Sequence, residues 1–114
     1  MSKRIYLSDP CTGYGEAERN AFFQKWEDFF SQKGYEVFNP RKNGLPRSSS
    51  WHEHMRKDIA ELCGCDFIVR LSADTSQGVN FEIKVALELG IPIVFYDQIM
   101  RCGNDKVKLD YLFT

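Results

Sequence analysis

Two carboxylates in this sequence occupy helix positions that an amphipathic pattern assigns to apolar side chains. The first is Glu82. On a helix that advances about 100° per residue, Glu82 falls between Leu89 and Val79, on the apolar side. Glu88 falls on the opposite side, where a solvated charge belongs. Because an unpaired buried charge is costly, an inward Glu82 needs a partner or a chemical purpose, and the helix dipole stabilises a carboxylate near the helix start.

Asp58 repeats this anomaly on the preceding helix. It lies on the same side as Met55 and Leu62, between apolar neighbours. Acidic side chains are rarely buried without a partner. Two inward acids near the same edge of a sheet therefore favour a functional site.

A structural role for either acid stays open on the sequence alone. Glu82 would then bind backbone amides at the start of its helix. Asp58 would instead pair with a nearby cation, for which the sequence offers Arg56, Lys57 and Arg70.

The order of elements predicts how these acids are positioned. Short buried strands alternate with amphipathic helices, and this pattern indicates a parallel sheet with helices on both faces. We expect a single domain over residues 1–114, with a flavodoxin-like, three-layer α/β fold and four or five parallel strands. The expected strands are 3–8, 35–39, 66–71 and 91–97, and the expected helices are 16–33, 51–63 and 78–89.

Local signals support these bounds. The first helix carries an aromatic stripe that is typical of packing against a sheet. Gly34 and Gly90 end the first and third helices, and Ser50 is the expected N-cap of the second. We expect residues 41–50 to form a flexible loop that could act as a lid, and residues 111–113 to dock as a last turn or short strand. The stripe consists of Phe22, Phe23, Trp26, Phe29 and Phe30.

Composition excludes several classes of protein. The chain has 114 residues, a formal net charge of −1 and no apolar run near the length of a membrane span. This charge gives no electrostatic basis for binding a nucleic acid polymer or an anionic membrane. The start of the chain predicts no signal peptide, so we expect a cytoplasmic protein with free thiols rather than disulfides. The spacing of cysteines and histidines predicts no metal site.

In parallel α/β sheets, ligands bind where the strands end. The loops at that edge begin at Asp9, Pro40 and Ser72. The third loop runs through Ser76 and Gly78 into the helix that carries Glu82. A helix start is an anion site, because its free amide groups point toward the ligand.

These motifs, in this order, resemble the nucleoside 2-deoxyribosyltransferase superfamily, and most closely its small branch of 2'-deoxynucleoside 5'-phosphate N-hydrolases. The resemblance spans roughly residues 4 to 96. It rests on the opening strand and loop (Ile5 to Pro10, then Thr12 and Gly13), on Asp58 eight residues before Asp66, on Ser76-x-Gly78 with Glu82 four residues later, and on Gly90-Ile91-Pro92.

The resemblance implies roles for these residues. Glu82 would be the nucleophile that attacks C1' of a 2'-deoxyribosyl group, and Tyr6 would hydrogen-bond its carboxylate. Asp58 would contact the sugar or protonate the departing base. A retaining glycosidase uses a carboxylate nucleophile in the same way. Substrate-binding positions would be Ser8, Asp9, Ser76, Gly78 and Asn80, with Ser76 near a 5'-phosphate.

Asp9 departs from the family pattern, which commonly has glycine there. Its carboxylate would repel a phosphate, unless it points away, contacts a ribose hydroxyl or indicates a substrate without phosphate. The implied function is cleavage of the N-glycosidic bond of a deoxynucleotide without a cofactor, in a homodimer with sites near the interface. Deoxyribosyl transfer between bases, a non-catalytic nucleotide-binding module and a receiver-like scaffold are the alternatives.

Overall fold

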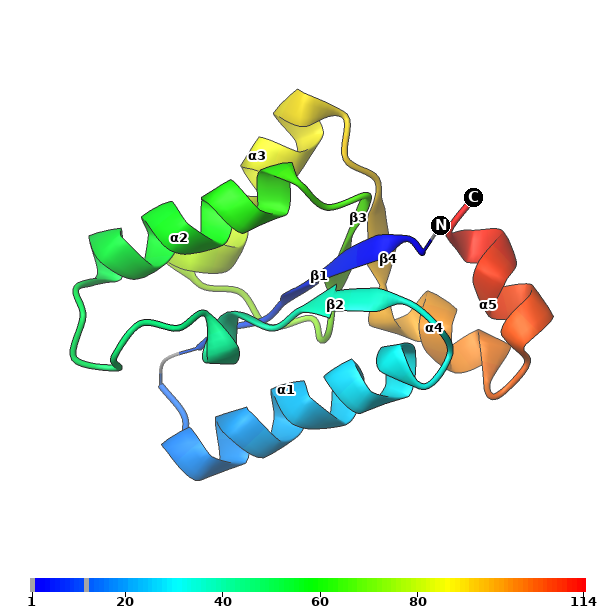
Figure 1. Cartoon of the computed structure of the whole chain (residues 1–114), viewed down its shortest axis with the longest axis horizontal. Coiled ribbons are helices and arrows are strands. Elements are labelled where there is room, and N and C mark those ends of the chain that lie inside the picture. Colours follow the sequence, from blue (N-terminus) through cyan, green and yellow to red (C-terminus); the bar gives the residue numbers. More distant parts are fainter. Residues whose placement is uncertain (1, 12) are drawn as a thin grey trace.

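Four parallel strands in the order β2-β1-β3-β4 form the centre of the protein (Figure 1). This computed structural model describes residues 2–11 and 13–114, so Thr12 of the first-loop motif lies outside the described residues. The sequence-predicted three-layer, flavodoxin-like α/β fold is confirmed, with four strands. The strands are β1 (Arg4–Ser8), β2 (Glu36–Phe38), β3 (Phe67–Arg70) and β4 (Ile93–Phe95).

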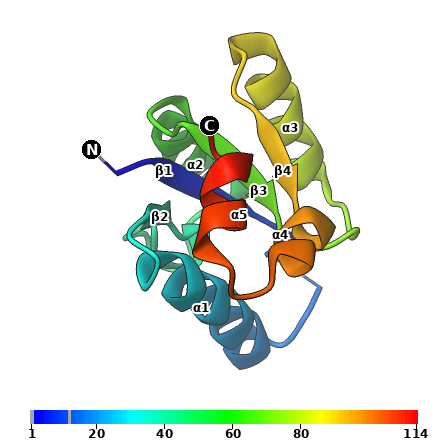
Figure 2. The ribbon, with the colours of Figure 1, turned by 90° about the vertical axis from the view of Figure 1, so that its right-hand side faces the viewer.

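Helices cover both faces of this sheet (Figures 1 and 2). Helices α2 (Trp51–Cys63) and α3 (Gln77–Leu89) lie on one face, and α1 (Glu16–Ser31) lies on the other. The chain then adds α4 (Tyr96–Cys102) and α5 (Lys106–Leu112), which pack on the α1 side. A short 3-10 helix, η1 (Pro40–Lys42), follows β2.

Strand β1 divides its side chains between the two faces. Successive residues of a strand point to opposite sides, so Ile5 and Leu7 enter the cluster under α1, and Tyr6 faces α2 and α3. All three are fully buried, as is expected for a central parallel strand. Ser8 follows Tyr6 on the same face, where it reaches α3.

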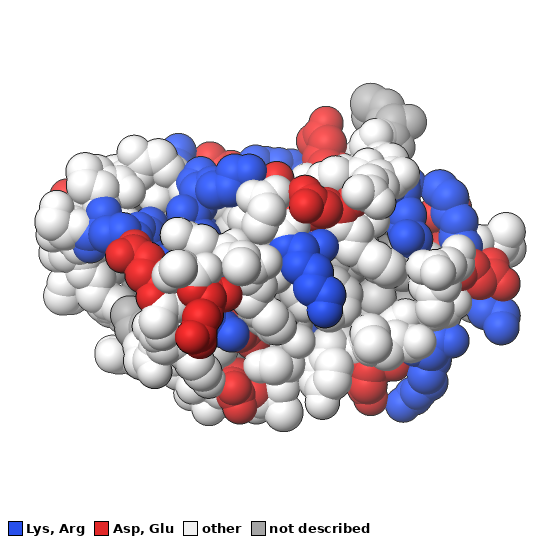
Figure 3. Space-filling view, turned by 90° about the horizontal axis from the view of Figure 1, so that it is seen from below, with Lys and Arg blue, Asp and Glu red and all other residues white. Residues whose placement is uncertain are grey.

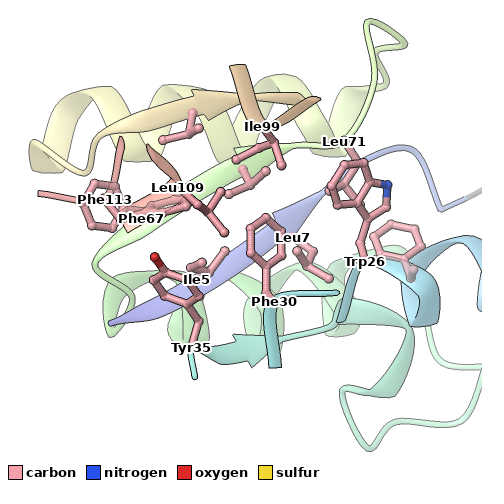
Figure 4. Close-up of a cluster of buried hydrophobic side chains, with 13 residues drawn as sticks. Ile5, Leu7, Trp26, Phe30, Tyr35, Phe67, Leu71, Ile99, Leu109 and Phe113 are labelled. Carbon is pink, nitrogen blue, oxygen red and sulfur yellow. The ribbon is translucent and has the colours of Figure 1, made fainter. Parts of the chain in front are cut away.

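The main apolar core fills the space between the sheet and α1 (Figure 4). Phe30 of α1 and Phe113 after α5 are both buried, and their ring centroids lie 5.9 Å apart. Phe113 also meets Phe67 of β3 edge to face, an arrangement that aromatic pairs favour. The expected docking of the C-terminal residues is therefore present at Phe113, whereas Tyr111 is exposed.

The predicted end of the fourth strand, at residue 97, was wrong. Residues 96 and 97 begin α4 instead of extending β4. Gln98 accounts for the change, because its side chain accepts a hydrogen bond from the Phe95 backbone N–H at 2.9 Å and closes the first turn of the helix.

The predicted loop 41–50 also begins inside η1. Gly90 does end α3, with φ of 70°, a left-handed backbone conformation that favours glycine.

The surface shows no single field of charge on the face drawn in Figure 3, where basic and acidic side chains are interspersed. All four cysteines are free, as predicted. Within residues 2–11 and 13–114, no helix is both long and apolar enough to cross a membrane.

Candidate active site

A cavity of about 370 Å³ opens beyond the carboxyl ends of β1 and β3. This is the edge where parallel α/β sheets bind ligands, next to the point at which the strand order reverses. Both predicted acids, Glu82 and Asp58, line it. The remaining lining comes from the first loop, η1, the loop before α2, and the starts of α2 and α3: Asp9, Cys11, Pro40, Arg41, Arg47, Ser49, Trp51, His54, Met55, Ser76, Gln77, Gly78 and Val79.

Glu82 lies on α3, one turn after the start of the helix, and is buried as predicted. Two hydroxyl groups of β1 hold its carboxylate. The Tyr6 hydroxyl donates to Oε2, which is the hydrogen bond that the family resemblance implied, and Ser8 Oγ donates to Oε1 at 2.9 Å. Both donors are buried beneath the cavity, so they orient the carboxylate from the sheet side. Its partners are hydroxyls, not the backbone amides that the alternative required.

The surroundings of Glu82 disfavour its charged form. Burial raises the pKa of Glu82 to about 8, against the opposing effect of the hydrogen bonds from Tyr6 and Ser8. The negative charge of Asp58 is a smaller contribution to the same increase. A carboxyl group with such a pKa holds a proton near neutral pH, and strongly shifted pKa values are common at functional sites.

Asp58 reaches the same cavity from the middle of α2. Ser50 and Glu53 form the capping box that starts this helix, and Asp58 lies two turns further on, 6% exposed. Its Oδ1 accepts a hydrogen bond from Asn43 Nδ2 at 2.9 Å. Burial raises the pKa of Asp58, and the hydrogen bond from Asn43 opposes this.

The cations that the sequence offered as partners of Asp58 lie elsewhere. Lys57 pairs with Glu61 at 3.3 Å, and Arg70 donates to the backbone oxygen of Asp74 at 2.7 Å. Asp58 therefore forms no ion pair with any residue that the structure describes, and a neutral amide is its hydrogen-bond partner. This arrangement leaves Asp58 free to exchange a proton within the cavity.

Asp9 lines the cavity, but protein partners hold its carboxylate. Arg19 Nη1 donates to its Oδ2 and Ser72 Oγ donates to its Oδ1, so both oxygens are occupied. The guanidinium of Arg19 also stacks on Tyr14, 4.2 Å from the ring centroid. Of the three explanations for this acid, the geometry comes nearest to the first, because Arg19 and Ser72 bind both carboxylate oxygens and Arg19 offsets the charge.

The other predicted substrate-binding residues divide into three groups. Ser76 and Gly78 line the cavity, and Ser76 caps α3 by accepting from the Val79 N–H at 3.1 Å. Ser8 contacts Glu82 rather than the open cavity. Asn80 is exposed on α3, outside the set of residues that line the cavity.

Comparison with known proteins places the sequence in a family. The profile of DUF4406, described as a domain of unknown function, matches residues 3–95. The chain belongs to the DUF4406 family. A search of curated proteins found no match for this DUF4406 protein.

Two solved structures resemble the DUF4406 chain. A 2-deoxyribosyltransferase from Bacillus psychrosaccharolyticus has a TM-score of 0.65 and 24% identity, over 81% of this chain and 70% of that one. The CMP N-glycosidase BcmB of Clostridium botulinum has a TM-score of 0.58 and 21% identity, over 82% and 67% of the two chains. At this level of identity the likeness shows a shared fold.

Three residues of this DUF4406 site were not predicted from the sequence. Arg19 lies four residues before Phe23 and eleven before Phe30, so the helical period places it on the buried stripe of α1, a signal that the pattern did contain. Arg41 is held in place by donation to the backbone oxygen of Cys11 at 3.0 Å, and its side chain is 5% exposed. Asn43 lies in the predicted flexible loop, where no sequence period reveals burial.

The cavity of the DUF4406 chain is suited to an organic anion. Arg41 and Arg47 are among the residues that line it, and the start of α3 contributes backbone amides beside Ser76. Among the described residues, no group of three or more His, Cys, Asp or Glu is placed to hold a metal ion.

Proposed function

We propose that this protein cleaves the N-glycosidic bond of a 2'-deoxynucleoside 5'-monophosphate, with Glu82 as nucleophile. The observation that carries the proposal is the buried Glu82 carboxylate, held by the hydroxyls of Tyr6 and Ser8 in a cavity that also contains Asp58. Fixed donors on both oxygens orient a carboxylate for attack in one direction. The similar structures, a 2-deoxyribosyltransferase and a CMP N-glycosidase, support this choice of bond.

The reaction uses one carboxylate and one carboxylic acid. A Glu82 oxygen forms a bond to C1' while the bond from C1' to the base nitrogen breaks, and Asp58 gives a proton to the departing base. Water then attacks C1' of the glutamyl ester. This second step releases deoxyribose 5-phosphate, restores the Glu82 carboxylate and returns a proton to Asp58.

The two acids must hold one proton between them for this reaction. The charge of Asp58 contributes to the raised pKa of Glu82, so a proton on Asp58 favours the ionised form of Glu82. The singly protonated pair supplies a nucleophile and an acid at the same time. Glu82, whose pKa is about 8, must lose its proton before it attacks C1'.

A 5'-phosphate is the part of the substrate that the cavity wall favours. Ser76 and the amide groups at the start of α3 offer donors, and Arg41 and Arg47 add positive charge. Asp9 does not oppose this, because Arg19 and Ser72 occupy its oxygens. These features favour a nucleotide over a nucleoside.

Transfer of the deoxyribosyl group to a second base is the alternative outcome of the same intermediate. Water and an acceptor base compete for the same ester, and one of the two similar structures is a transferase. A binding module without turnover is a further alternative. It would bind the same nucleotides through the same cavity but release no base.

The deciding experiment measures both the release of free base and the formation of a covalent adduct on the protein. The protein is incubated with a panel of deoxynucleosides and their monophosphates, with and without an added acceptor base, and released base is measured by chromatography. Quenched samples are then analysed by mass spectrometry for a deoxyribose 5-phosphate adduct on the peptide that contains Glu82. Glu88→Gln, an exposed change on the same helix, should leave the adduct intact, whereas Glu82→Gln should abolish it.

Nucleotide binding without base release would support the binding module and reject the enzyme. A new nucleoside or nucleotide formed only when acceptor base is present would reassign the protein as a transferase. Free base with no adduct under any quench condition would remove Glu82 as nucleophile.

We also propose that the protein forms a homodimer beside this site. A groove between α2 and α3 carries the half-exposed rings of Trp51 and Phe81, and such patches commonly mark contacts between proteins. Trp51, Met55 and Gln77 line both the groove and the cavity, so a partner there would adjoin the site. Light scattering on the wild type and on Phe81→Glu tests this, with a monomeric wild type as the contrary result.

A further inference from the structure

Asn43 occupies a buried position in the loop between η1 and α2, and its amide orientation is fixed by an obligatory donor. The backbone N–H of Leu45 donates to Asn43 Oδ1 at 3.0 Å, and Arg47 Nη2 approaches the same oxygen at 3.4 Å. Because a backbone N–H can only donate, Oδ1 must be on that side. The amide nitrogen therefore faces Asp58 and His54.

His54 is fixed in the same way. Its Nε2 lies 3.1 Å from the backbone oxygen of Pro46, which can only accept, so Nε2 carries a hydrogen. In neutral His54, Nδ1 is then an acceptor, and Asn43 Nδ2 lies 3.0 Å from it. One N–H of Asn43 thus donates to His54 and the other donates to Asp58 Oδ1.

These contacts decide which oxygen of Asp58 can carry a proton. Oδ1 accepts an N–H at 2.9 Å, and the carbonyl oxygen of a neutral carboxylic acid is a better acceptor than its hydroxyl oxygen. Within the described part of the chain, Oδ1 is the only Asp58 oxygen with a hydrogen-bond partner, and Asp58 lines the cavity. The proton of the neutral acid is consequently left to Oδ2.

We propose that Asn43, oriented by the Leu45 N–H and by His54, is a positioning residue that confines the Asp58 proton to Oδ2, from which it passes to the departing base. This inference rests on the proposed function, because it concerns how Asp58 serves as the acid in that reaction. It assigns a task to the loop before α2, which joins η1 to the helix that carries Asp58. Neither Asn43 nor His54 is required to touch the substrate.

The first test separates positioning of the acid from general support of the fold. Asn43→Leu keeps approximate size and removes both donors. With unmodified deoxynucleotides, kcat should fall about tenfold to a hundredfold, part of the usual contribution of a general acid. With an N7-methylated purine deoxynucleotide, whose base leaves without needing a proton, kcat should change less than about twofold.

Matched variants distinguish loss of positioning from a general folding defect. Asn104→Leu, in the exposed loop between α4 and α5, should leave both substrates unaffected. His54→Phe should repeat the selective loss, whereas His54→Asn, whose side-chain oxygen can replace Nδ1 as acceptor, should recover most of it. Asn43→Leu combined with Asp58→Asn should be no slower than Asp58→Asn alone, because both changes act through one proton.

A second measurement needs no turnover. Carbon NMR of the Asp58 carboxyl group should show a higher pKa in Asn43→Leu than in the wild type, because a donor to the charged form is lost. Nitrogen NMR of His54 should show the hydrogen on Nε2. An unchanged Asp58 pKa, or equal losses with both substrates, would overturn the positioning role while leaving the proposed function intact. If wild-type protein releases base from no substrate, the proposed function fails and this inference fails with it.

Discussion

The two faces of the sheet bury different kinds of side chain, although both are served by the same central strand. On the α1 face, Ile5 and Leu7 of β1 enter a cluster built from aromatic and aliphatic groups (Figure 4). On the α2–α3 face, Tyr6 and Ser8 present hydroxyl groups to a buried carboxylate. Because strand residues alternate, one segment of five residues supplies both a stabilising core and the floor of a polar cavity.

The two faces therefore differ in what they contribute: one stabilises the fold, and the other holds the acidic groups. Apolar burial contributes about 25 cal/mol per Å², whereas a buried acid costs free energy unless its oxygens are hydrogen-bonded. The α1 face carries most of the large buried rings, and the α2–α3 face holds Glu82 and Asp58. We infer that the first face stabilises the fold enough to keep two acids with raised pKa values in the second.

The largest effect should come from removing the carboxylate of the polar face. Glu82→Gln should lower kcat by about a thousandfold or more, since a covalent nucleophile is lost. Stability should be unchanged or higher at pH 8, because a neutral amide replaces a group that burial disfavours as an anion. Steady-state kinetics and urea unfolding measure the two effects. More than about a tenth of wild-type activity would contradict the nucleophile assignment.

The opposite outcome is expected for the apolar face. Phe30→Ala should lower the free energy of unfolding by about 3–5 kcal/mol, as for other buried phenylalanines. Activity per folded molecule should stay within about twofold of wild type, because Phe30 packs on the far side of the sheet. Tyr111→Ala, at an exposed ring, is the control. A large loss of kcat in folded Phe30→Ala would show that the two faces are coupled.

The sequence predicted the features that repeat with a period. Glu82 and Asp58 stood out because their neighbours formed apolar arcs over helices of three turns or more, and both are buried. Short helices carry no such signal. Each of α4 and α5 has a single buried residue, Ile99 and Leu109, so no apolar stripe marked either helix in the sequence.

Hydrogen-bond partners that lie far apart in the chain were the second feature that the sequence did not reveal. Asp9 was recognised as an anomaly, but its partner Arg19, which lies on a different element, was not identified. Asn43 is buried by the conformation of an irregular loop, through its hydrogen bonds to Leu45 and Asp58. Loop conformation depends on tertiary contacts, so composition alone indicated only flexibility there.

Breaking the Asp9–Arg19 pair should cost nearly as much as the core truncation. Asp9→Asn leaves Arg19 buried with a weaker partner, and we expect a loss of about 3 kcal/mol in the free energy of unfolding. Arg19→Met in the same chain should restore most of it, because an apolar side chain fits beside Phe22 and Phe23. A double-mutant cycle by urea unfolding measures the coupling. Additive single effects would contradict a buried pair.

The free energy of unfolding should depend on pH, because the buried acid Glu82 has a raised pKa. The pKa of Glu82 is about 8 in the folded protein and lower when unfolded, so the folded state binds an extra proton between about pH 4.5 and 8. Stability should therefore fall as pH rises through this window, by up to about 1.4 kcal/mol per pH unit.

Glu82→Gln separates this effect from other titrations. Its stability should depend less steeply on pH, leaving the smaller contribution of Asp58, whose pKa burial also raises. Urea unfolding at several pH values compares the two proteins. Parallel stability profiles for wild type and Glu82→Gln would show that Glu82 loses its proton at the same pH in both states.

The smallest effect concerns the substrate rather than the fold. Ser76→Gly should raise KM for the deoxynucleoside monophosphate about tenfold, because one charge-assisted hydrogen bond to the phosphate is lost. KM for the matching nucleoside should barely change. Glycine is a tolerable N-cap, so α3 should lose only a few tenths of a kcal/mol. Initial rates with both substrates give the two KM values.

Ser50→Gly is the matched control for this change. It removes the same kind of N-cap from α2, and Ser50 lies outside the set of residues that line the cavity. If Ser76→Gly acts through the phosphate, only Ser76→Gly should discriminate between nucleotide and nucleoside. If both variants raise KM equally for the two substrates, Ser76 acts as a cap alone. The cavity would then select its substrate by the sugar and base, and a nucleosidase or deoxyribosyltransferase acting on nucleosides would fit it better than a nucleotide hydrolase.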